Sequence, residues 1–220
     1  MQITQVFKGV FRIDGKLATL NLVPSARVYG EELKTVQGAE YRMWNPYRSK
    51  LAAAILNGMK TMAITEGSEV LYLGAANGTT CSHVSDIVGG SGSVYCVEVS
   101  KRSMRDLLDL CDARENMLPI FTDARYIDEY KDDVGTVDVL YQDVSAQEQA
   151  DILLKNSALL DSEGIAYVAI KSQSIDITRK PEEIFEEFID AVSDEFSVIE
   201  RIRLEPYDKM HLFVVFRKRR

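Results

Sequence analysis

The sequence has few cysteines and histidines and no long apolar run. Its three cysteines, Cys81, Cys96 and Cys111, form no CxxC pair, and no cluster of histidine and cysteine accompanies them. They predict neither a disulfide framework nor a zinc site, and we interpret them as reduced core thiols in a cytosolic compartment. The longest apolar run, from Leu51 to Leu56, has six residues, whereas a membrane-spanning helix needs roughly 18.

The pattern of a secretory signal is also missing. The first fifteen residues alternate in polarity and carry Lys8, Arg12 and Asp14, unlike a signal peptide. Hydrophobic residues make up 46% and charged residues 27% of the 220 residues. These values are typical of one globular domain, or of one domain with a small appendage.

Positive charge is scarce overall but is concentrated at both ends of the chain. The formal net charge is −8, which by itself argues against nucleic-acid binding. Residues 1–60 nevertheless carry nine Lys and Arg against four Asp and Glu, and residues 201–220 carry seven against two. If the two ends meet in the fold, they present a basic patch suited to phosphates; otherwise they are solvated surface charges.

The first fifty residues favour short strands. Val10 to Ile13 and Leu17 to Leu20 flank Asp14-Gly15, a dipeptide typical of a two-residue hairpin turn. No helical period occurs before Ser49, which is placed to cap a helix that begins at Lys50. We therefore predict a small β-rich domain over residues 1–50 and a second domain over residues 51–220.

From Glu69 onward, apolar runs alternate with amphipathic stretches. This alternation predicts a mostly parallel, doubly wound sheet of the α/β class. The last two apolar runs have no helix between them, so we expect an antiparallel hairpin at the sheet edge. The predicted strands are 70–73, 93–97, 117–121, 137–141, 165–170, 196–204 and 212–216. The predicted helices are 79–88, 100–111 with Ser100 as its cap, one around 152–159 and one from 181.

Ligands of such sheets bind beyond the carboxyl ends of the strands. The first strand ends in a glycine-rich loop, Gly74 to Thr80, that leads into a helix. The second ends at Glu98, where a carboxylate can accept from the ribose hydroxyls of a nucleoside, and the third is followed by Asp123-Ala124, where an acid can accept from an adenine amine. A tight turn alone would explain the glycines, but the three strand ends together favour a nucleoside site.

The loop disfavours ligands with phosphates. It has no GK[ST] and lacks the middle glycine of GxGxxG, so close approach of a triphosphate or pyrophosphate is not supported. A nucleoside without phosphates, such as S-adenosylmethionine, is compatible with this loop.

Charged residues also follow the fourth and fifth strands. Asp143 is the evident partner of Lys171, because lysine is almost never buried without one; the pair is either structural or catalytic. His211 opens the last strand and points toward the same edge. His83 is expected to be packed or at the surface, and Trp44, with Tyr41, Arg42 and Arg48 near it, forms either an RNA-stacking surface or the core of the small domain.

Seven stretches, in this order along the chain, closely resemble the fibrillarin family. The resemblance runs from about residue 7 to residue 216 and is to the short archaeal form, without the Gly/Arg-rich tail of eukaryotic members, which implies a cytoplasmic protein. The stretches are YRMWNPYRSKLAAAIL, VLYLGAANGTTCSHVSDIVG, VYCVEVS, TDAR, YQDVSAQEQA, IKSQSID and EPYDKMH.

The resemblance implies a class I S-adenosylmethionine-dependent methyltransferase that acts on ribose 2′-hydroxyls of rRNA and tRNA. It implies as partners a box C/D guide RNA and its target RNA, a Nop-domain scaffold protein and a kink-turn-binding ribosomal-like protein. Neither a metal nor a membrane is implied.

The resemblance also assigns residues, motif by motif. Thr79 and Thr80 line the methionine side of the cofactor, Glu98 takes the ribose, Val99 flanks the adenine and Asp123 with Ala124 takes its polar edge. The full cofactor set is Gly74, Ala75, Gly78, Thr79, Thr80, Glu98, Val99, Asp123, Ala124, Asp143, Val144 and Ala146. The catalytic set is Lys50, Asp143, Lys171 and His211. The sequence departs from the usual family pattern at Asn77, Val99, Ser145, Ala146 and Met210.

Two other classes of function remain open. A nicotinamide oxidoreductase would use the same sheet and Glu98, but it should carry GxGxxG and would not need the catalytic set. A non-catalytic assembly subunit would hold the cofactor for stability alone, and a broken catalytic set would mark it. Methylation of protein glutamine, known for eukaryotic relatives, is a further open activity.

Overall fold

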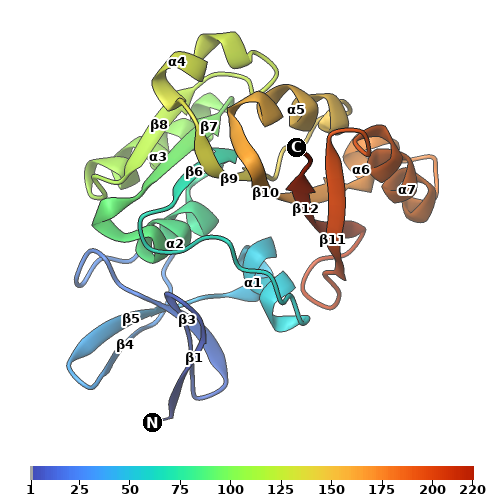
Figure 1. The fold of residues 1–220 in the computed structure, drawn as a ribbon. Helices are drawn as coiled ribbons and strands as arrows, with labels where there is room; N and C mark the ends of the chain where they lie inside the picture. Colours follow the sequence, from blue (N-terminus) through green and yellow to red (C-terminus); the bar gives the residue numbers. More distant parts are fainter. Residues whose placement is uncertain (1) are drawn as a thin grey trace.

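The computed structural model describes residues 2–220, which form two β-sheets joined through helices (Figure 1). Sheet A lies at the bottom of the view, and the larger sheet B lies above it, beyond α1 (Lys50–Leu56) and α2 (Thr79–Val88). The strand β1 of sheet A lies at the bottom of the view, and the carboxyl end lies near its middle, above β12 of sheet B.

Sheet A is an antiparallel sheet of five strands in the order β1-β2-β3-β5-β4. Asp14 and Gly15 take positive φ angles of 48° and 85° at the turn between β2 and β3, as a two-residue hairpin requires, so the predicted hairpin is confirmed. The strands are β1 (Ile3–Phe7), β2 (Val10–Ile13), β3 (Lys16–Leu20), β4 (Leu33–Val36) and β5 (Ala39–Met43).

Sheet B has seven strands in the order β11-β12-β10-β9-β6-β7-β8. The five strands from β8 to β10 are parallel, while β12 pairs antiparallel with both β10 and β11. The doubly wound sheet and its antiparallel edge hairpin are thus confirmed. The strands are β6 (Glu69–Leu73), β7 (Ser93–Glu98), β8 (Met117–Phe121), β9 (Val137–Gln142), β10 (Leu160–Lys171), β11 (Phe196–Arg203) and β12 (His211–Lys218).

Helices cover both faces of sheet B because successive strand residues point to opposite faces. Tyr72 and Tyr141 pack with α1, α2 and α3 on one face, whereas Leu71 and Leu140 pack with α4, α5 and α7 on the other. The remaining helices are α3 (Lys101–Asp112), α4 (Lys131–Val134), α5 (Gln149–Asn156), α6 (Ser172–Ile175) and α7 (Pro181–Ala191), with 3-10 turns η1 (Pro46–Arg48), η2 (Gly89–Ser91), η3 (Ile127–Glu129) and η4 (Ser157–Leu159). Within residues 2–220, no helix is long and apolar enough to cross a bilayer.

The predicted helix caps are present. The Ser49 hydroxyl accepts a hydrogen bond from the backbone N–H of Ala52 at the start of α1, and Ser100 does the same for Ser103 at the start of α3. Such caps satisfy amide donors that the first turn of a helix leaves free. The cap at Ser49 fixes the position of Lys50, the first residue of α1.

A buried polar cluster joins sheet A to α2. Arg42 from β5 forms ion pairs with Glu31 (2.6 Å) and Asp86 (2.8 Å), and Arg114 forms a second ion pair with Asp86 at 2.7 Å. His83 is fully buried between them, and Trp44 stacks on its ring with centroids 4.7 Å apart. Trp44 and Arg42 are therefore core, which decides against the alternative of an RNA-stacking surface.

The two basic ends of the chain do meet. The Asn57 side chain, just after α1, donates hydrogen bonds to the backbone carbonyls of Arg203 and Glu205. The Lys50 ammonium lies 3.8 Å from a carboxylate oxygen of Asp208. Side chains from the first sixty and the last twenty residues therefore share one surface.

Candidate active site

A cleft of about 310 Å³ opens at the carboxyl ends of the parallel strands of sheet B. Eight of the residues predicted to bind a cofactor line this cleft, at the strand ends where ligands of such sheets bind. They are Gly74, Glu98, Val99, Asp123, Ala124, Asp143, Val144 and Ala146, and Arg125, Ser145, Ile152 and Lys171 line it with them.

Gly74 lets the loop after β6 pack closely on the end of β9. Its φ is +83°, and a Cβ there would lie 2.7 Å from the carbonyl oxygen of Asp143 and 3.2 Å from the nitrogen of Val144. Only glycine fits such a position without strain. The backbone of this loop therefore sets where Asp143 stands.

Glu98 holds the loop with both oxygens of its carboxylate. Oε2 accepts from the Ala76 N–H at 2.7 Å, and Oε1 accepts from the Ser100 N–H at 2.6 Å. The side chain is at the end of β7 and is only 8% exposed. Because each oxygen has a second lone pair, the carboxylate can accept two further hydrogen bonds from a ligand in the cleft.

Asp123, after β8, is held by Arg125. The guanidinium donates from Nη2 to Oδ2 at 2.7 Å and from Nε to Oδ1 at 3.0 Å. These hydrogen bonds, with the charge of Arg125, lower the pKa of Asp123 below its ordinary value although partial burial opposes the shift. The aspartate thus stays an acceptor, as a contact to an adenine amine requires.

Four predicted cofactor residues lie outside this cleft. Ala75 is buried behind the loop, and Gly78 takes a φ of +78° at the start of α2, where a Cβ would collide with Leu110. Thr79 lines a different cleft, between the 23–29 segment and α3. The Thr80 hydroxyl donates to Ser49 Oγ at 3.0 Å, which ties α2 to the cap of α1.

Lys50, Asp143 and Lys171 converge at the mouth of the cleft. Asp143 Oδ1 lies 2.8 Å from the ammonium of Lys171 and 3.0 Å from that of Lys50. Lys171 also donates to the Asp143 carbonyl (2.8 Å) and to Ser145 Oγ (3.0 Å). The expected pairing of Asp143 with Lys171 is thus present, and it includes a second lysine from a distant part of the chain.

His211 reaches this group through a residue that the sequence analysis did not single out. His211 stands directly opposite Lys171 in the pairing of β12 with β10. Its Nδ1 lies 2.8 Å from Asp208 Oδ1, while Asp208 Oδ2 is 3.8 Å from the Lys50 ammonium. The spacing Asp208-x-x-His211, in a loop before a strand, is the signal that was available.

Gln149 is a second residue that the sequence analysis did not find. It is fully buried, its Oε1 accepts from the Lys171 N–H at 3.0 Å, and its Nε2 donates to the carbonyls of Ala146 and Lys171. These hydrogen bonds join the end of β10 to the loop after β9, and a buried amide that satisfies both fixes their relative position. A polar side chain on the helix face that also carries Ile152 and Leu153 was its only sequence signal.

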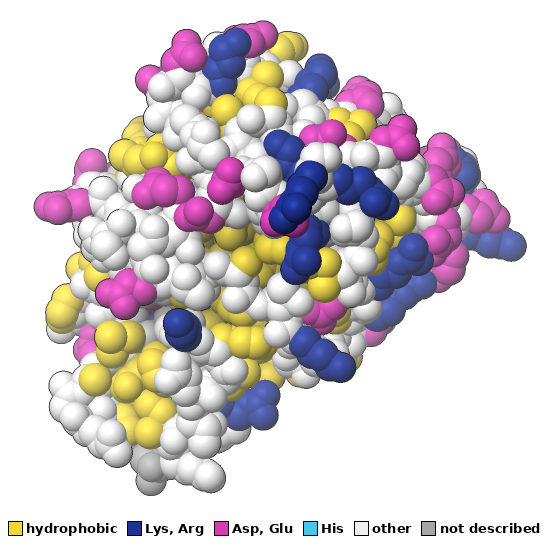
Figure 2. Space-filling model, viewed as in Figure 1, with side chains coloured by type: hydrophobic (Ala, Val, Ile, Leu, Met, Phe, Trp, Pro, Cys, Tyr) yellow, Lys and Arg dark blue, Asp and Glu magenta, His cyan; other side chains and the backbone are white. Residues whose placement is uncertain are grey.

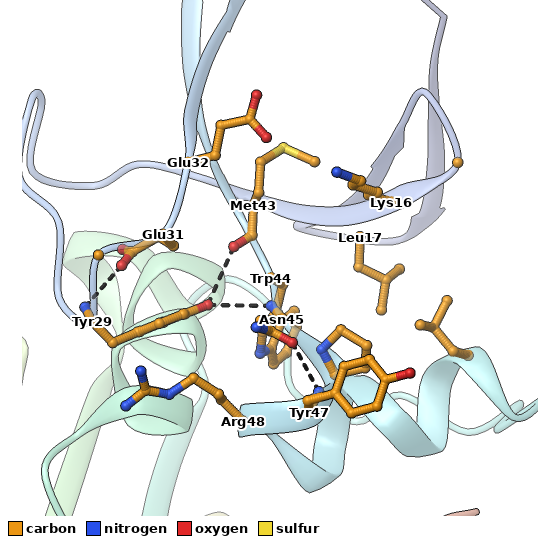
Figure 3. A pocket seen from close by; sticks show the side chains of 14 residues that line it. Lys16, Leu17, Tyr29, Glu31, Glu32, Met43, Trp44, Asn45, Tyr47 and Arg48 are labelled. Carbon is orange, nitrogen blue, oxygen red and sulfur yellow. Dashed lines mark hydrogen bonds between the residues drawn. The ribbon is translucent and has the colours of Figure 1, made fainter. Parts of the chain in front are cut away.

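A larger cleft of about 520 Å³ lies between sheet A and α1 (Figure 3). Tyr47, in η1, lies along it with a 67% exposed side chain, and its backbone N–H is held by Asn45 Oδ1. Its ring meets that of Tyr207 edge to face at 5.1 Å. Tyr47, rather than Trp44, is therefore the exposed aromatic residue of this cleft.

The charges around the site are arranged by sign. Figure 2 shows Lys and Arg side chains gathered at the middle of this face, over the region of β10, β12 and α1 in Figure 1, while Asp and Glu gather toward α7. Several acids of α7 are paired with arginines, as in Glu186 with Arg201 and Glu182 with Arg203. The cations at the middle of the face are thus suited to an anionic ligand despite the negative net charge.

Comparison with known proteins identifies the family of this chain. The fibrillarin family model matches residues 1–220. The chain belongs to the fibrillarin family. The fibrillarin-like rRNA/tRNA 2′-O-methyltransferase of Pyrococcus furiosus is 50% identical over 218 residues, which cover 96% of each protein.

Solved fibrillarins share the whole fold. The chain is similar to the Aeropyrum pernix fibrillarin with natively bound S-adenosyl-L-methionine, at a TM-score of 0.91 and 42% identity, with 98% of each chain covered. It is also similar to the fibrillarin of a fibrillarin/Nop5p complex, at a TM-score of 0.90 and 36% identity, over 99% of this chain and 100% of that one. The fibrillarin fold predicted from the motifs is therefore confirmed.

Proposed function

We propose that this chain transfers the methyl group of S-adenosylmethionine to ribose 2′-hydroxyls of rRNA and tRNA, directed by a box C/D guide RNA. The observation that carries the proposal is the convergence of Lys50, Asp143 and Lys171, with His211 beside them, at the mouth of the cleft that Glu98 and Asp123 line. The methyltransferase names of its relatives support the same reading.

The residues of the cleft fit S-adenosylmethionine. Glu98 has two lone pairs free for the ribose hydroxyls, and Asp123 is kept ionised for the adenine amine. Val99 and Ala146 offer apolar contact for the base. Gly74 and Asp143, whose backbones pack together, line the part of the cleft that would take the sulfonium end of the cofactor. The sulfonium supplies the methyl group as an electrophile when bound.

The lysine site then handles the proton and the position of the hydroxyl. The reaction needs an aligned hydroxyl and an acceptor for its proton. We assign the proton to Nζ of Lys171 in its neutral amine form; the transfer converts the amine to the ammonium that Asp143 and Ser145 hold at 2.8 and 3.0 Å, and the ammonium returns the proton to solvent. Lys50 and His211 position the ribose and its phosphate. Asp143 orients both lysines and favours the cationic cofactor beside it.

We further propose that the chain works within an assembly. A Nop-domain scaffold is the expected partner, because a relative that is similar over its whole length was solved with Nop5p. The guide RNA, the target RNA and a kink-turn-binding ribosomal-like protein complete the set. Residues 1–50, as a separate small domain, and the acidic faces near it are the expected docking surface for the scaffold.

Methyl transfer to a guide-matched RNA tests this function. The full chain, with labelled S-adenosylmethionine, should methylate the guide-matched 2′-hydroxyl when scaffold, kink-turn protein and guide RNA are present, and it should bind RNA poorly and methylate little alone. The control is a target whose selected residue is 2′-deoxy. Robust guide-directed methylation by the chain alone would reject the dependence on an assembly, and methylation of the 2′-deoxy control would reject the ribose assignment.

A further inference from the structure

Asp208 links two parts of the site that are otherwise separate. One of its carboxylate oxygens lies 2.8 Å from Nδ1 of His211, and the other lies 3.8 Å from the ammonium of Lys50. Lys50 in turn lies 3.0 Å from Asp143, the partner of Lys171. The five side chains form one continuous row from Lys171 to His211, and Asp208 is the member with no assigned role.

The hydrogen bonds of His211 fix which ring nitrogen carries the proton. Nδ1 lies 2.8 Å from the Lys209 carbonyl oxygen and 2.8 Å from Asp208. A carbonyl and a carboxylate can only accept, so Nδ1 must be the donor. Within residues 2–220, Nε2 has no hydrogen-bond partner, so this nitrogen remains for a substrate.

The loop that carries Asp208 is itself held in place. The Asp208 N–H donates to the Leu204 carbonyl, and Asn57 donates to the carbonyl of Glu205. On the other side of Asp208, the Ser172 hydroxyl donates to the Met210 carbonyl at 2.9 Å. Asp208 therefore meets His211 from a fixed backbone.

Electrostatics keep Asp208 charged. Partial burial favours its neutral form, but the hydrogen bond and charge of His211 together with the charge of Lys50 outweigh it and lower the pKa of Asp208 below its ordinary value. A charged carboxylate is the form that can hold both neighbours.

We propose that Asp208 is a positioning residue that orients His211, with Nε2 toward the substrate, and holds Lys50 between two carboxylates. The inference rests on the proposed methyl transfer and deepens it. Asp208 touches neither cofactor nor ribose in this role; it acts through His211 and Lys50, in the way a third residue orients a catalytic base.

Histidine ¹⁵N spectroscopy tests the orienting role without RNA or cofactor. The chain contains two histidines, so ¹⁵N-histidine labelling with a His211→Gln reference assigns the signals. His211 should be the Nδ1–H tautomer in the parent and in Asp208→Asn, whose amide oxygen still accepts. In Asp208→Ala, the Lys209 carbonyl is the one acceptor left to Nδ1 of those in the parent, so the share of the Nε2–H tautomer should rise. An unchanged tautomer in Asp208→Ala would overturn the orienting role.

Single-turnover methyl transfer in the full assembly tests the consequence. Asp208→Ala should lower the rate by roughly tenfold to a hundredfold, the range for losing a partner that orients a functional histidine, and leave affinity for S-adenosylmethionine unchanged. Asp208→Asn should lose less, since it keeps the acceptor and loses the charge. Glu205→Gln is the matched control, because Glu205 is exposed in the same loop. This variant removes one negative charge, as the two Asp208 variants do.

The outcomes separate the two proposals. A rate for Asp208→Ala equal to that of Glu205→Gln would overturn the positioning role, and so would a rate loss that only follows a lower melting temperature. A parent chain that transfers no methyl group in the assembly would reject the proposed function instead, while the tautomer measurement would still decide whether Asp208 orients His211.

Discussion

At the scale of single residues, the site concentrates like charges and balances them. Two ammonium groups share one oxygen of Asp143, at 2.8 and 3.0 Å, with all three side chains less than one-fifth exposed. Partly buried cations so close together repel each other unless a carboxylate is present. Asp143 is therefore structurally needed by both lysines, and replacing a lysine leaves the other still paired.

Because of this arrangement, replacing Lys171 tests catalysis more clearly than replacing Asp143 does. Lys171→Ala should preserve folding, because Lys50 remains to pair Asp143, and should lower methyl transfer by roughly 10² to 10⁴, the range for a positioned acid or base. Adding Asp143→Ala should cost less than the product of the two single effects, because the residues act as a unit. Single-turnover rate and melting temperature on each variant check this.

The opposite result for Lys171 has a distinct signature. If the lysine is only structural, its removal should lower the melting temperature, because Asp143 and Ser145 each lose a partner, while the rate stays close to that of the parent. Lys155→Ala is the control for the loss of a positive charge, because Lys155 is an exposed lysine of α5.

Glu98 is the residue on which the cofactor assignment depends most. Glu98→Ala should weaken S-adenosylmethionine binding by roughly 1–3 kcal/mol, the scale of hydrogen bonds to a charged group, measured by calorimetry. Part of this loss comes through the loop, because Ala76 and Ser100 lose their acceptor. Glu115→Ala, an exposed acid before β8, should bind normally; equal affinity of the two variants would refute the ribose contact.

At the scale of elements, the conformation of the loop after β6 requires a residue without a side chain at Gly74. Gly74→Ala should destabilise the protein, because a left-handed non-glycine residue costs about 1–3 kcal/mol and the new Cβ collides with the backbone at Asp143. Gly38→Ala is the matched control: its φ is +84° and its Cβ would meet nothing within 4 Å. The difference in unfolding free energy between the two variants isolates the collision.

Denaturant unfolding of the two glycine variants checks this reasoning, and cofactor affinity gives a second measurement. Gly74→Ala should also weaken S-adenosylmethionine binding, because the collision moves Asp143 and Val144, which line the cleft. Gly38→Ala should not. Equal unfolding free energies for the two variants would show that the loop tolerates the Cβ and that its close approach to β9 is not required.

Elements with local signals were predictable from the sequence, and those built by long-range contacts were not. Asp14-Gly15, Ser49 and Ser100 carry their turn or cap chemistry within four residues, and each is found as expected. By contrast, the insertion of β5 between β3 and β4 in sheet A depends on pairing that no local pattern specifies.

The residues of the candidate site also divide into those with a local sequence signal and those without one. Strand-end residues such as Glu98 and Lys171 are marked by the apolar run that precedes them, so they were found. Asp208 meets Lys50, which lies 158 positions away in the sequence, and Gln149 meets Lys171, 22 positions away. A side chain that serves so distant a group leaves no periodic signal. Trp44 shows the remaining ambiguity, since aromatic and basic neighbours suit both a core and a binding surface.

At the scale of the whole molecule, sheet A is attached through charge rather than through apolar packing alone. Arg42, Glu31, Asp86 and Arg114 are all buried at this junction, and each cation has a carboxylate within 2.8 Å. Removing one member leaves an unpaired buried charge, which is strongly destabilising. The junction holds the segment from β5 to α1, and through it Lys50, in a fixed place relative to sheet B.

His83 makes this junction sensitive to acid. Its Nδ1 meets the Thr19 hydroxyl and its Nε2 meets the Tyr29 hydroxyl, both at 2.7 Å. Since Thr19 donates its proton to Asp86, the network assigns the proton of the neutral ring to Nδ1. Burial first, and then the charges of Arg42 and Arg114, lower the pKa of His83 well below 6.5.

The sign of the pH effect follows from this shift. The unfolded chain takes up a proton at this histidine as the pH falls through about 6.5, whereas the folded chain keeps the ring neutral. Stability should be full above that pH and should fall by about 1.4 kcal/mol per pH unit below it, until the folded ring is protonated. Carboxylates with a lowered pKa, such as Glu31, reduce the stability of the fold only at lower pH, from about 4.5 downward.

Unfolding free energy measured from pH 7.5 to 5 checks the role of His83. The parent should lose stability steadily below pH 6.5, and His83→Gln should be less stable at pH 7.5 but flatter across this range, because the titrating group is gone. His211→Gln removes the other histidine, which lies partly exposed at the catalytic edge, and should keep the slope of the parent. A parent that is flat between pH 6.5 and 5, or a slope that persists in His83→Gln, would show that the junction of the two sheets does not depend on a neutral imidazole.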